Sequence, residues 1–288
     1  GGHLSIANVV KVEFNGFEYS PEPTRIGLPA GGMPTSSSSE VTAATDSVDV
    51  ASYLRFGGGV EVIGMAGGVR EFLLYRTAGG GLTHLVIDSA HVSINGVLDM
   101  AADFHFAQTP GGFEMTLGAE ARLLELYEAT VVGMIEHGNE TRAGLFVALG
   151  VEIPLVPPAL VLSQVGGGFF YNARQEHLDL VRQYAKVPGL DGGAFKGETG
   201  RFTGMLYANA VIVAEQIAQA RVLLTVSEAG AQLDGRMALL STSGDLDAAT
   251  IRGDLNLAVG FKQKYAEGNF NLVVDFDPSI RTQENKPI

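Results

Sequence analysis

Residues 94–104 read INGVLDMAADF and are followed by GGFEMTL at 111–117. The same pattern returns as IRGDLNLAVGF at 251–261 and GNFNLVV at 268–274, at a constant offset of 157 residues and without a gap. In each copy alternate positions are apolar, which is the period-two pattern of a β-strand with one apolar face. We therefore predict a duplicated β-hairpin, with chance similarity between two hairpins of common composition as the alternative.

Glycine turns separate short apolar runs over most of the remaining chain. The sequence holds 38 glycines in 288 residues, without the three-residue period of collagen. Between residues 48 and 150 these turns recur about every 8–16 residues, as they do in an antiparallel meander or sandwich. The predicted fold is all-β, with mostly antiparallel meander, sandwich or barrel-like sheets, an internal duplication and one short helix near 173–186.

The helix is predicted from a cap and a periodic face. Asn172 stands where an N-cap is expected, Leu178, Val181 and Ala185 follow at helical spacing, and Pro188 with the next glycine would end the helix. Residues 207–220 are ambiguous, because alanine and glutamine favour a helix whereas the β-branched residues at 211–213 favour a strand.

Composition changes suggest six parts of the chain. A Pro/Ser/Gly-rich segment follows the first strand, and we interpret it as a mobile loop or as a connector that lets this strand reach a neighbouring subunit. The expected parts are an N-terminal strand (1–20), the loop or linker (21–47), a first β unit (48–165), a Gly-rich connector with the short helix (166–200), a second β unit (201–276) and a polar tail (277–288).

Charge and composition exclude several classes of partner and chemistry. The formal charge of −13 argues against nucleic-acid binding, which needs clustered lysine and arginine. The chain has no cysteine, so disulfides and thiolate chemistry are absent. No apolar run is long enough for a spanning helix. Since the chain starts with Gly1 and not with methionine, we expect a processed form or a piece of a longer protein.

Candidate sites are few. Asp99, Asp103 and His105 share one face of their expected strand and could bind a divalent cation such as calcium, whereas a solvated outer face opposite an apolar one explains both copies of the repeat. Asn139 begins a glycosylation sequon at an expected turn, which suits an extracellular or cell-surface protein. The sequence contains no Gly-x-Ser-x-Gly motif of serine hydrolases, no phosphate-binding loop ending in Gly-Lys-Ser/Thr and no Gly-x-Gly-x-x-Gly motif of dinucleotide-binding proteins between a strand and a helix. We therefore assign no catalytic or cofactor-binding residue.

A glycine-rich stretch carries a resemblance. Residues 165–172 read VGGGFFYN and resemble a segment of large, uncharacterised, strand-rich bacterial proteins of unknown function, and residues 206–240 are similar to them more loosely. The resemblance implies a bacterial β-rich module and no particular activity. Physically, three consecutive glycines let the backbone pass close to a neighbouring element or to a ligand.

Three functions compete. The first is a non-enzymatic, structural or self-assembling protein, such as a filament, a tube, a surface layer or a subunit of a larger complex, which forms a homo-oligomer or polymer through strand edges. The second is a carrier or groove for apolar ligands such as lipids, in which one continuous apolar sheet face is not closed on a packed core. The third is a carbohydrate-active enzyme on a β scaffold, because carboxylates are abundant.

Overall fold

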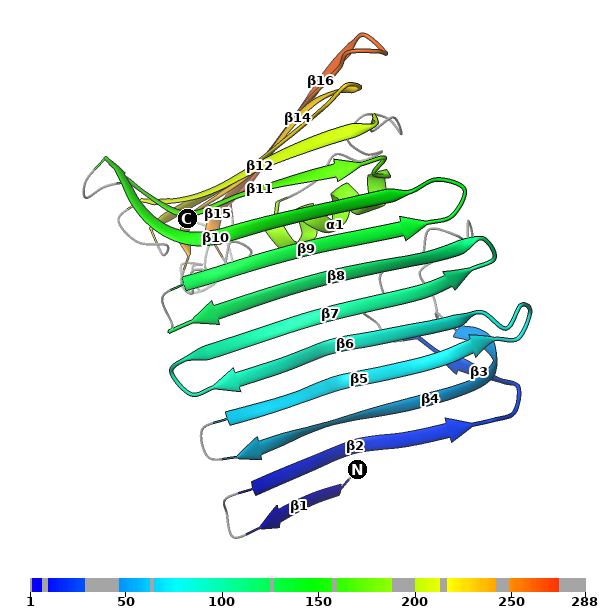
Figure 1. Ribbon diagram of the computed structural model, residues 1–288. Helices are drawn as coiled ribbons and strands as arrows, with labels where there is room; N and C mark the ends of the chain where they lie inside the picture. The colour runs from blue at the N-terminus through cyan, green and yellow to red at the C-terminus, as the bar shows by residue number, and fades with distance from the viewer. Residues whose placement is uncertain are drawn as a thin grey trace, which may run out of the picture. The chain divides into compact units, whose positions relative to one another are not determined.

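The computed structural model describes residues 2–6, 10–28, 47–62, 65–124, 127–156, 160–187, 200–212, 217–241 and 249–274. In this part of the chain the fold is an antiparallel β meander with one short helix (Figure 1). Fifteen described strands follow one another in the sheet in chain order, and one further strand, β3, pairs with β4. The predicted all-β fold is confirmed.

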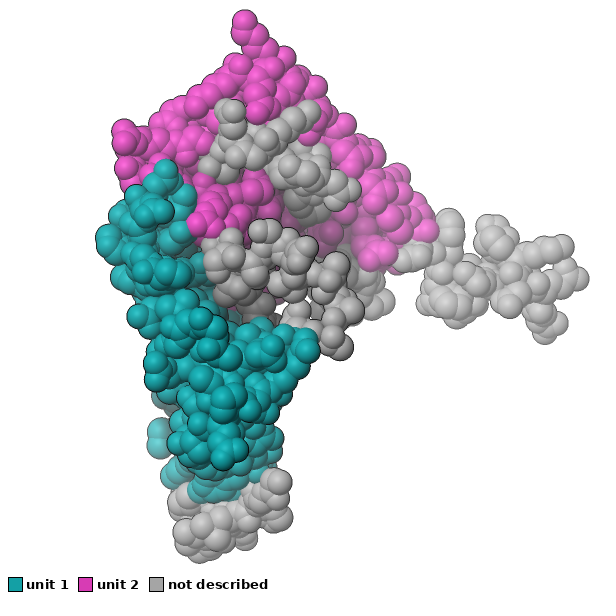
Figure 2. Space-filling view, turned by 90° about the vertical axis from the view of Figure 1, so that its right-hand side faces the viewer, with its two compact units in different colours: residues 1–145 teal, residues 146–288 magenta. Residues whose placement is uncertain are grey.

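The chain divides into two compact units, residues 1–145 and 146–288, which are coloured separately in Figure 2. β10 (Arg142–Val156) contains the division. The other strands of unit 1 are β1 (Gly2–Ile6), β2 (Val10–Ser20), β3 (Thr24–Gly27), β4 (Ser47–Val62), β5 (Met65–Thr77), β6 (Thr83–Ile94), β7 (Leu98–Thr109), β8 (Gly112–Leu123) and β9 (Tyr127–His137).

Unit 2 contains the helix and six further strands. They are β11 (Leu160–Tyr171), α1 (Gln175–Ala185), β12 (Phe202–Ile212), β13 (Ala218–Ser227), β14 (Gly230–Ser241), β15 (Ala249–Gly260) and β16 (Tyr265–Val274). Of residues 207–220, which were ambiguous in sequence, 207–212 belong to β12 and 218–220 to β13, so these described parts form strands and not a helix.

A small core in unit 1 lies where β3 meets the long strands. Ile26 packs with Val50, Leu73, Tyr75 and Val86, all of them buried. β3 is only four residues long, and its pairing with β4 brings Ile26 opposite Val48. The rest of the expected loop, residues 29–46, lies outside the described residues, as does the expected tail, residues 277–288.

The expectation of one N-terminal strand is wrong. β1 and β2 form an antiparallel hairpin in which Gly2 lies opposite Phe14 and Ile6 lies opposite Val10. The period-two pattern continues through both strands, and it therefore gives no sign of where the chain reverses.

The two hairpins of the sequence repeat pair differently. Leu98 of β7 lies opposite Leu123 of β8, whereas its counterpart Leu255 of β15 lies opposite Phe270 of β16. The second copy turns earlier, at residues 261–264, and turn position sets the register of a hairpin. Similar apolar faces are therefore built with different cross-strand pairs.

The cap of helix α1 lies two residues later than predicted. Arg174 is the residue that precedes the helix, and its backbone N–H donates to Nδ1 of His177 over 3.0 Å. The expected cap Asn172 has a φ of 50° and lies outside the helix. At the other end the chain leaves the helix through Lys186 in the left-handed conformation, before the predicted proline and glycine.

Residues 166–168 lie within β11, and Gly166 allows close packing against β10. A Cβ added to Gly166 would come within 2.7 Å of the Ala148 Cβ and 2.8 Å of the Ala148 Cα. No side chain fits at this distance, so the packing interpretation of the first of these glycines is supported.

Candidate functional site

Neighbouring residues of β12 differ sharply in exposure. Leu206 is 64% exposed, whereas the next residue, Tyr207, is 5% exposed. The difference continues along the strand, because Thr203, Met205 and Asn209 are buried on the side of Tyr207. Successive strand residues point to opposite faces of a sheet. One face of this strand is thus covered, and the other, which carries leucine, is open.

The open face is apolar on five consecutive strands of unit 2. Cross-strand pairing places Leu206, Leu224, Leu233 and Leu257 in one row across β12 to β15. We define the apolar face of unit 2 by the even-numbered positions of 202–212, 218–226 and 266–274 and the odd-numbered positions of 231–239 and 251–259, all of which are Gly, Ala, Val, Leu, Ile, Met or Phe.

The covered face of the same strands contains a buried polar network beneath α1. Asp234 is fully buried and accepts hydrogen bonds from Nε of Arg182 (2.7 Å), Nε2 of Gln232 (2.6 Å) and Nδ2 of Asn256 (2.8 Å). Leu178 and Val181 of the helix are also completely buried. The helix therefore covers a face that contains charged and amide side chains and leaves the purely apolar face open.

This arrangement reverses the usual distribution of polarity. A two-faced antiparallel sheet ordinarily packs its apolar face inward and leaves its polar face in water. On the apolar face of unit 2, Phe270, Leu272, Val259 and Leu257 are between 44% and 59% exposed. Large contiguous apolar patches mark sites that bind a protein, a membrane or a ligand.

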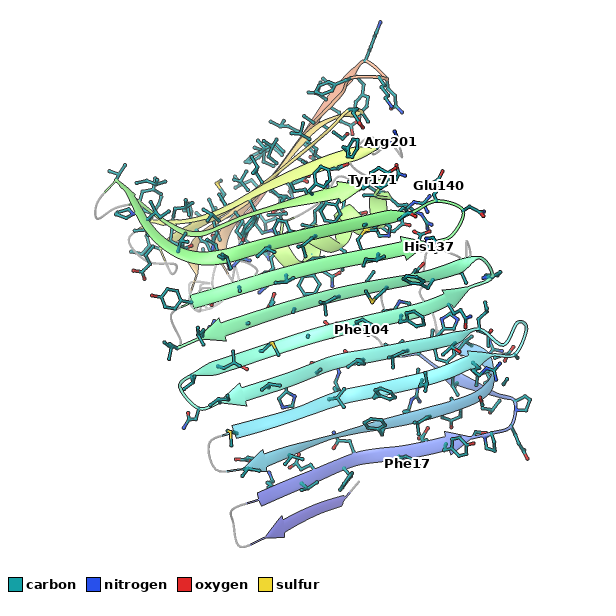
Figure 3. The ribbon with its side chains drawn as sticks, in the orientation of Figure 1. Phe17, Phe104, His137, Glu140, Tyr171 and Arg201 are labelled. Carbon is teal, nitrogen blue, oxygen red and sulfur yellow. The ribbon has the colours of Figure 1, made fainter. Side chains whose placement is uncertain are left out.

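Unit 1, considered by itself, also leaves apolar side chains open on one sheet face. Phe17, Phe56, Phe72, Ile87, Phe104 and Leu117 form one cross-strand row from β2 to β8. Phe17 is 72% exposed, and Phe56 stacks on Phe72 with ring centroids 4.5 Å apart. Figure 3 labels Phe17 and Phe104 along their strands. Each unit thus exposes an apolar sheet face.

The residues predicted as metal ligands share a face of β7, but their surroundings differ. Asp99 is exposed, Asp103 accepts a hydrogen bond at Oδ1 from the Ser89 backbone N–H (2.8 Å), and His105 is only 4% exposed. Among the described residues, no group of three or more carboxylate or histidine side chains is placed to hold a metal ion. The expectation that this face is fully solvated is wrong for His105.

Burial changes the chemistry of two histidines on that face. The pKa of His105 is lowered to about 4, mainly because burial disfavours the charged ring and also because His84 lies nearby. Burial lowers the pKa of His84 as well, and its ring stacks on Tyr75 at 4.8 Å. Above pH 5, His105 is therefore a neutral side chain.

Asn139 lies in the turn between β9 and β10 and is exposed. The neighbouring residue of the sequon, Glu140, pairs with Arg142 over 2.6 Å. The predicted turn position is confirmed, and attachment of a sugar there stays a prediction.

Comparisons with known proteins give no relative. No protein-family model, no curated protein and no solved structure matches the chain. Within the described residues, no helix has the length and apolar character needed to cross a membrane. The candidate site therefore depends on the geometry of the chain itself.

Sequence reasoning found the alternating pattern but did not identify which face is covered. The residue types on the polar face of β14 and β15 could have indicated that this face is covered. Residues 232, 234, 252, 254 and 256 are Gln, Asp, Arg, Asp and Asn. Mutually compatible donors and acceptors on adjacent strands can satisfy one another when buried.

Proposed function

We propose that the protein is a carrier that binds the acyl chains of lipids on the apolar face of unit 2. The observation that carries this proposal is the composition of that face: every position on β12 to β16 is apolar or glycine, and most large side chains are exposed. Acyl chains gain free energy from apolar contact and require no hydrogen bonds.

The same composition is less suited to a folded protein partner. Protein interfaces make about one hydrogen bond per 100–200 Å² and combine an apolar centre with polar groups. The apolar face of unit 2 offers no side-chain donor or acceptor across five strands. This lack of polar groups favours a ligand that is itself without them.

The dimensions of the strands fit acyl chains. β13 has 10 residues and β12 has 11. At a rise of about 3.3 Å per residue such strands are about 33–36 Å long. An acyl chain spans about half of a hydrocarbon core that is about 30 Å thick, so it can be covered along its length by one strand.

Binding of a neutral lipid tests the proposal. We expect the purified chain to bind a pyrene-labelled diacylglycerol, and the L206D variant to lose at least about tenfold in affinity because a charge enters the leucine row. The matched control is L124D, since Leu124 is 49% exposed but lies in unit 1, next to the end of β8. Absence of binding by the unaltered protein, or equal losses in both variants, would refute the carrier.

Self-association through a strand edge is the second candidate. Among the described strands β16 pairs with β15 alone, and it ends the strand order of the sheet. An open strand edge can pair with another chain. Sedimentation velocity over a range of protein concentrations distinguishes the two: concentration-dependent polymers that form without lipid and are abolished by N271P on β16 would favour self-association.

A further inference from the structure

One end of the apolar face of unit 2 is bordered by Arg201 and by two neighbouring turns of the chain. The backbone N–H of Arg201, just before β12, donates to Oε2 of Glu228 over 2.7 Å, which places it beside the turn between β13 and β14. In that turn Ala229 accepts a hydrogen bond from the backbone N–H of Phe261 (2.7 Å), which begins the turn between β15 and β16. These contacts place Arg201 and the two turns along one rim.

The described part of this rim is basic. Arg201, Lys262 and Lys264 are exposed cations, and Glu228 is the carboxylate among residues 201, 228–229 and 261–264. Backbone hydrogen bonds, first from Phe202 and also from Arg201, lower the pKa of Glu228, so this carboxylate is ionised and already engaged by N–H donors. Three cations against one engaged carboxylate stand out in a chain of formal charge −13.

The cations of the rim meet the apolar face through aromatic rings. The Arg201 guanidinium lies over the Tyr171 ring, 5.8 Å from its centroid. Tyr171 contacts Phe202 at 5.4 Å between centroids, and Phe202 contacts Phe169 at 5.7 Å. Figure 3 shows Tyr171 and Arg201 at the same end of β11 and β12. The basic rim and the apolar face are therefore continuous.

The described residues at the other end of the same strands include exposed apolar side chains. Ile212 at the end of β12, Ile217 before β13 and Leu240 near the end of β14 are 44%, 46% and 56% exposed. Among the described residues, polarity thus changes along the strands, from apolar side chains at one end to cations and aromatic rings at the other. A lipid with an anionic head group has the same change of polarity along its length.

We infer that the Arg201, Lys262 and Lys264 rim binds the anionic head group of the lipid whose acyl chains lie on the apolar face. The inference rests on the proposed carrier function and specifies its ligand class, a lipid that bears a phosphate or a similar oxyanion. Arginine binds such groups through paired N–H donors, lysine does so as a point charge, and Tyr rings favour the boundary between apolar and polar surroundings.

Two pyrene-labelled lipids with identical acyl chains, phosphatidic acid and diacylglycerol, provide the test. We expect the purified chain to bind phosphatidic acid about tenfold more tightly at low salt, and this ratio to decrease as salt is added. In the triple variant R201Q/K262Q/K264Q the two lipids should bind with equal affinity. The matched control K11Q removes an exposed cation of unit 1 and should retain the preference.

The outcomes separate this inference from the function on which it rests. Binding of diacylglycerol without any preference for phosphatidic acid, or a preference that survives in the triple variant, would overturn the head-group site and leave the carrier standing. Failure of the unaltered protein to bind diacylglycerol would overturn the carrier. Inorganic phosphate should weaken binding of phosphatidic acid and not of diacylglycerol; equal effects on both would also overturn the head-group site.

Discussion

Arg182 of α1 and Asp234 of β14 form an ion pair over 2.7 Å with side chains that are 3% and 0% exposed. The two residues are 52 positions apart in sequence. Gln232 and Asn256 donate to the other carboxylate oxygen, so the charge of Asp234 is compensated on both sides. This contact attaches the helix to the sheet face that also carries polar groups.

Removal of one partner should leave an uncompensated buried charge. We expect R182M to lower the free energy of unfolding by about 3–5 kcal/mol, measured by urea denaturation. The control is R236M, because Arg236 pairs with Asp254 over 2.8 Å where both side chains are about a quarter exposed. Its loss should be about 1 kcal/mol or less. Equal losses would show that burial of the Arg182 pair has no special weight.

Two leucines of the same hairpin should differ in their contribution to stability. Leu223 of β13 is completely buried, so L223A should cost about 2–5 kcal/mol in the free energy of unfolding. Leu206 of β12 is 64% exposed, and L206A should change stability by about 0.5 kcal/mol or less. Thermal unfolding of both variants provides the measurement. A large loss in L206A would mean that the leucine row is part of a core.

The glycine at position 166 should resist substitution. G166A would force a methyl group to within 2.7 Å of the Ala148 Cβ, and overpacking of this kind costs about 1–3 kcal/mol. At Gly204, on the next strand, the nearest atom to an added Cβ is the Val226 carbonyl oxygen at 4.0 Å. G204A should therefore be nearly neutral in chemical denaturation. Similar midpoints for the two variants would contradict the close packing of β10 and β11.

Acid should destabilise unit 1 through His105. Its pKa is about 4 in the folded chain and about 6.5 when unfolded, so the unfolded state binds more protons between these values. The free energy of unfolding should fall by about 3 kcal/mol as the pH decreases from about 6.5 to about 4. Above about pH 6.5 the ring is neutral in both states, and the titration of His105 should no longer lower the free energy of unfolding. His84, whose pKa is also lowered, acts in the same direction.

The variant H105N removes the titrating ring and should make the free energy of unfolding less dependent on pH in that range. Urea denaturation at several pH values, with the unaltered chain in parallel, measures the difference. Identical pH profiles would mean that His105 is not held neutral by burial. An NMR titration of the His105 ring measures its pKa directly.

The sequence by itself was sufficient to predict the class of fold and the two faces of each strand. Alternation at Leu98, Met100, Ala102 and Phe104 identified an apolar set, and glycine turns indicated an antiparallel meander. The helix was located because its periodic residues are local in sequence, although its cap is Arg174 and not Asn172. These features depend on interactions between near neighbours, and a single chain displays them directly.

The tertiary structure decided which face is covered and how the strands are paired. Alternation distinguishes two faces without assigning either to the interior, and the cover over the Asp234 side comes from Arg182 and its helix, distant in sequence. The register of each hairpin likewise depends on the position of its turn. For this reason Leu98 lies opposite Leu123, whereas its counterpart Leu255 lies opposite Phe270. The exposed apolar face, on which the proposed function rests, follows from these long-range contacts because they bury polar side chains that satisfy one another.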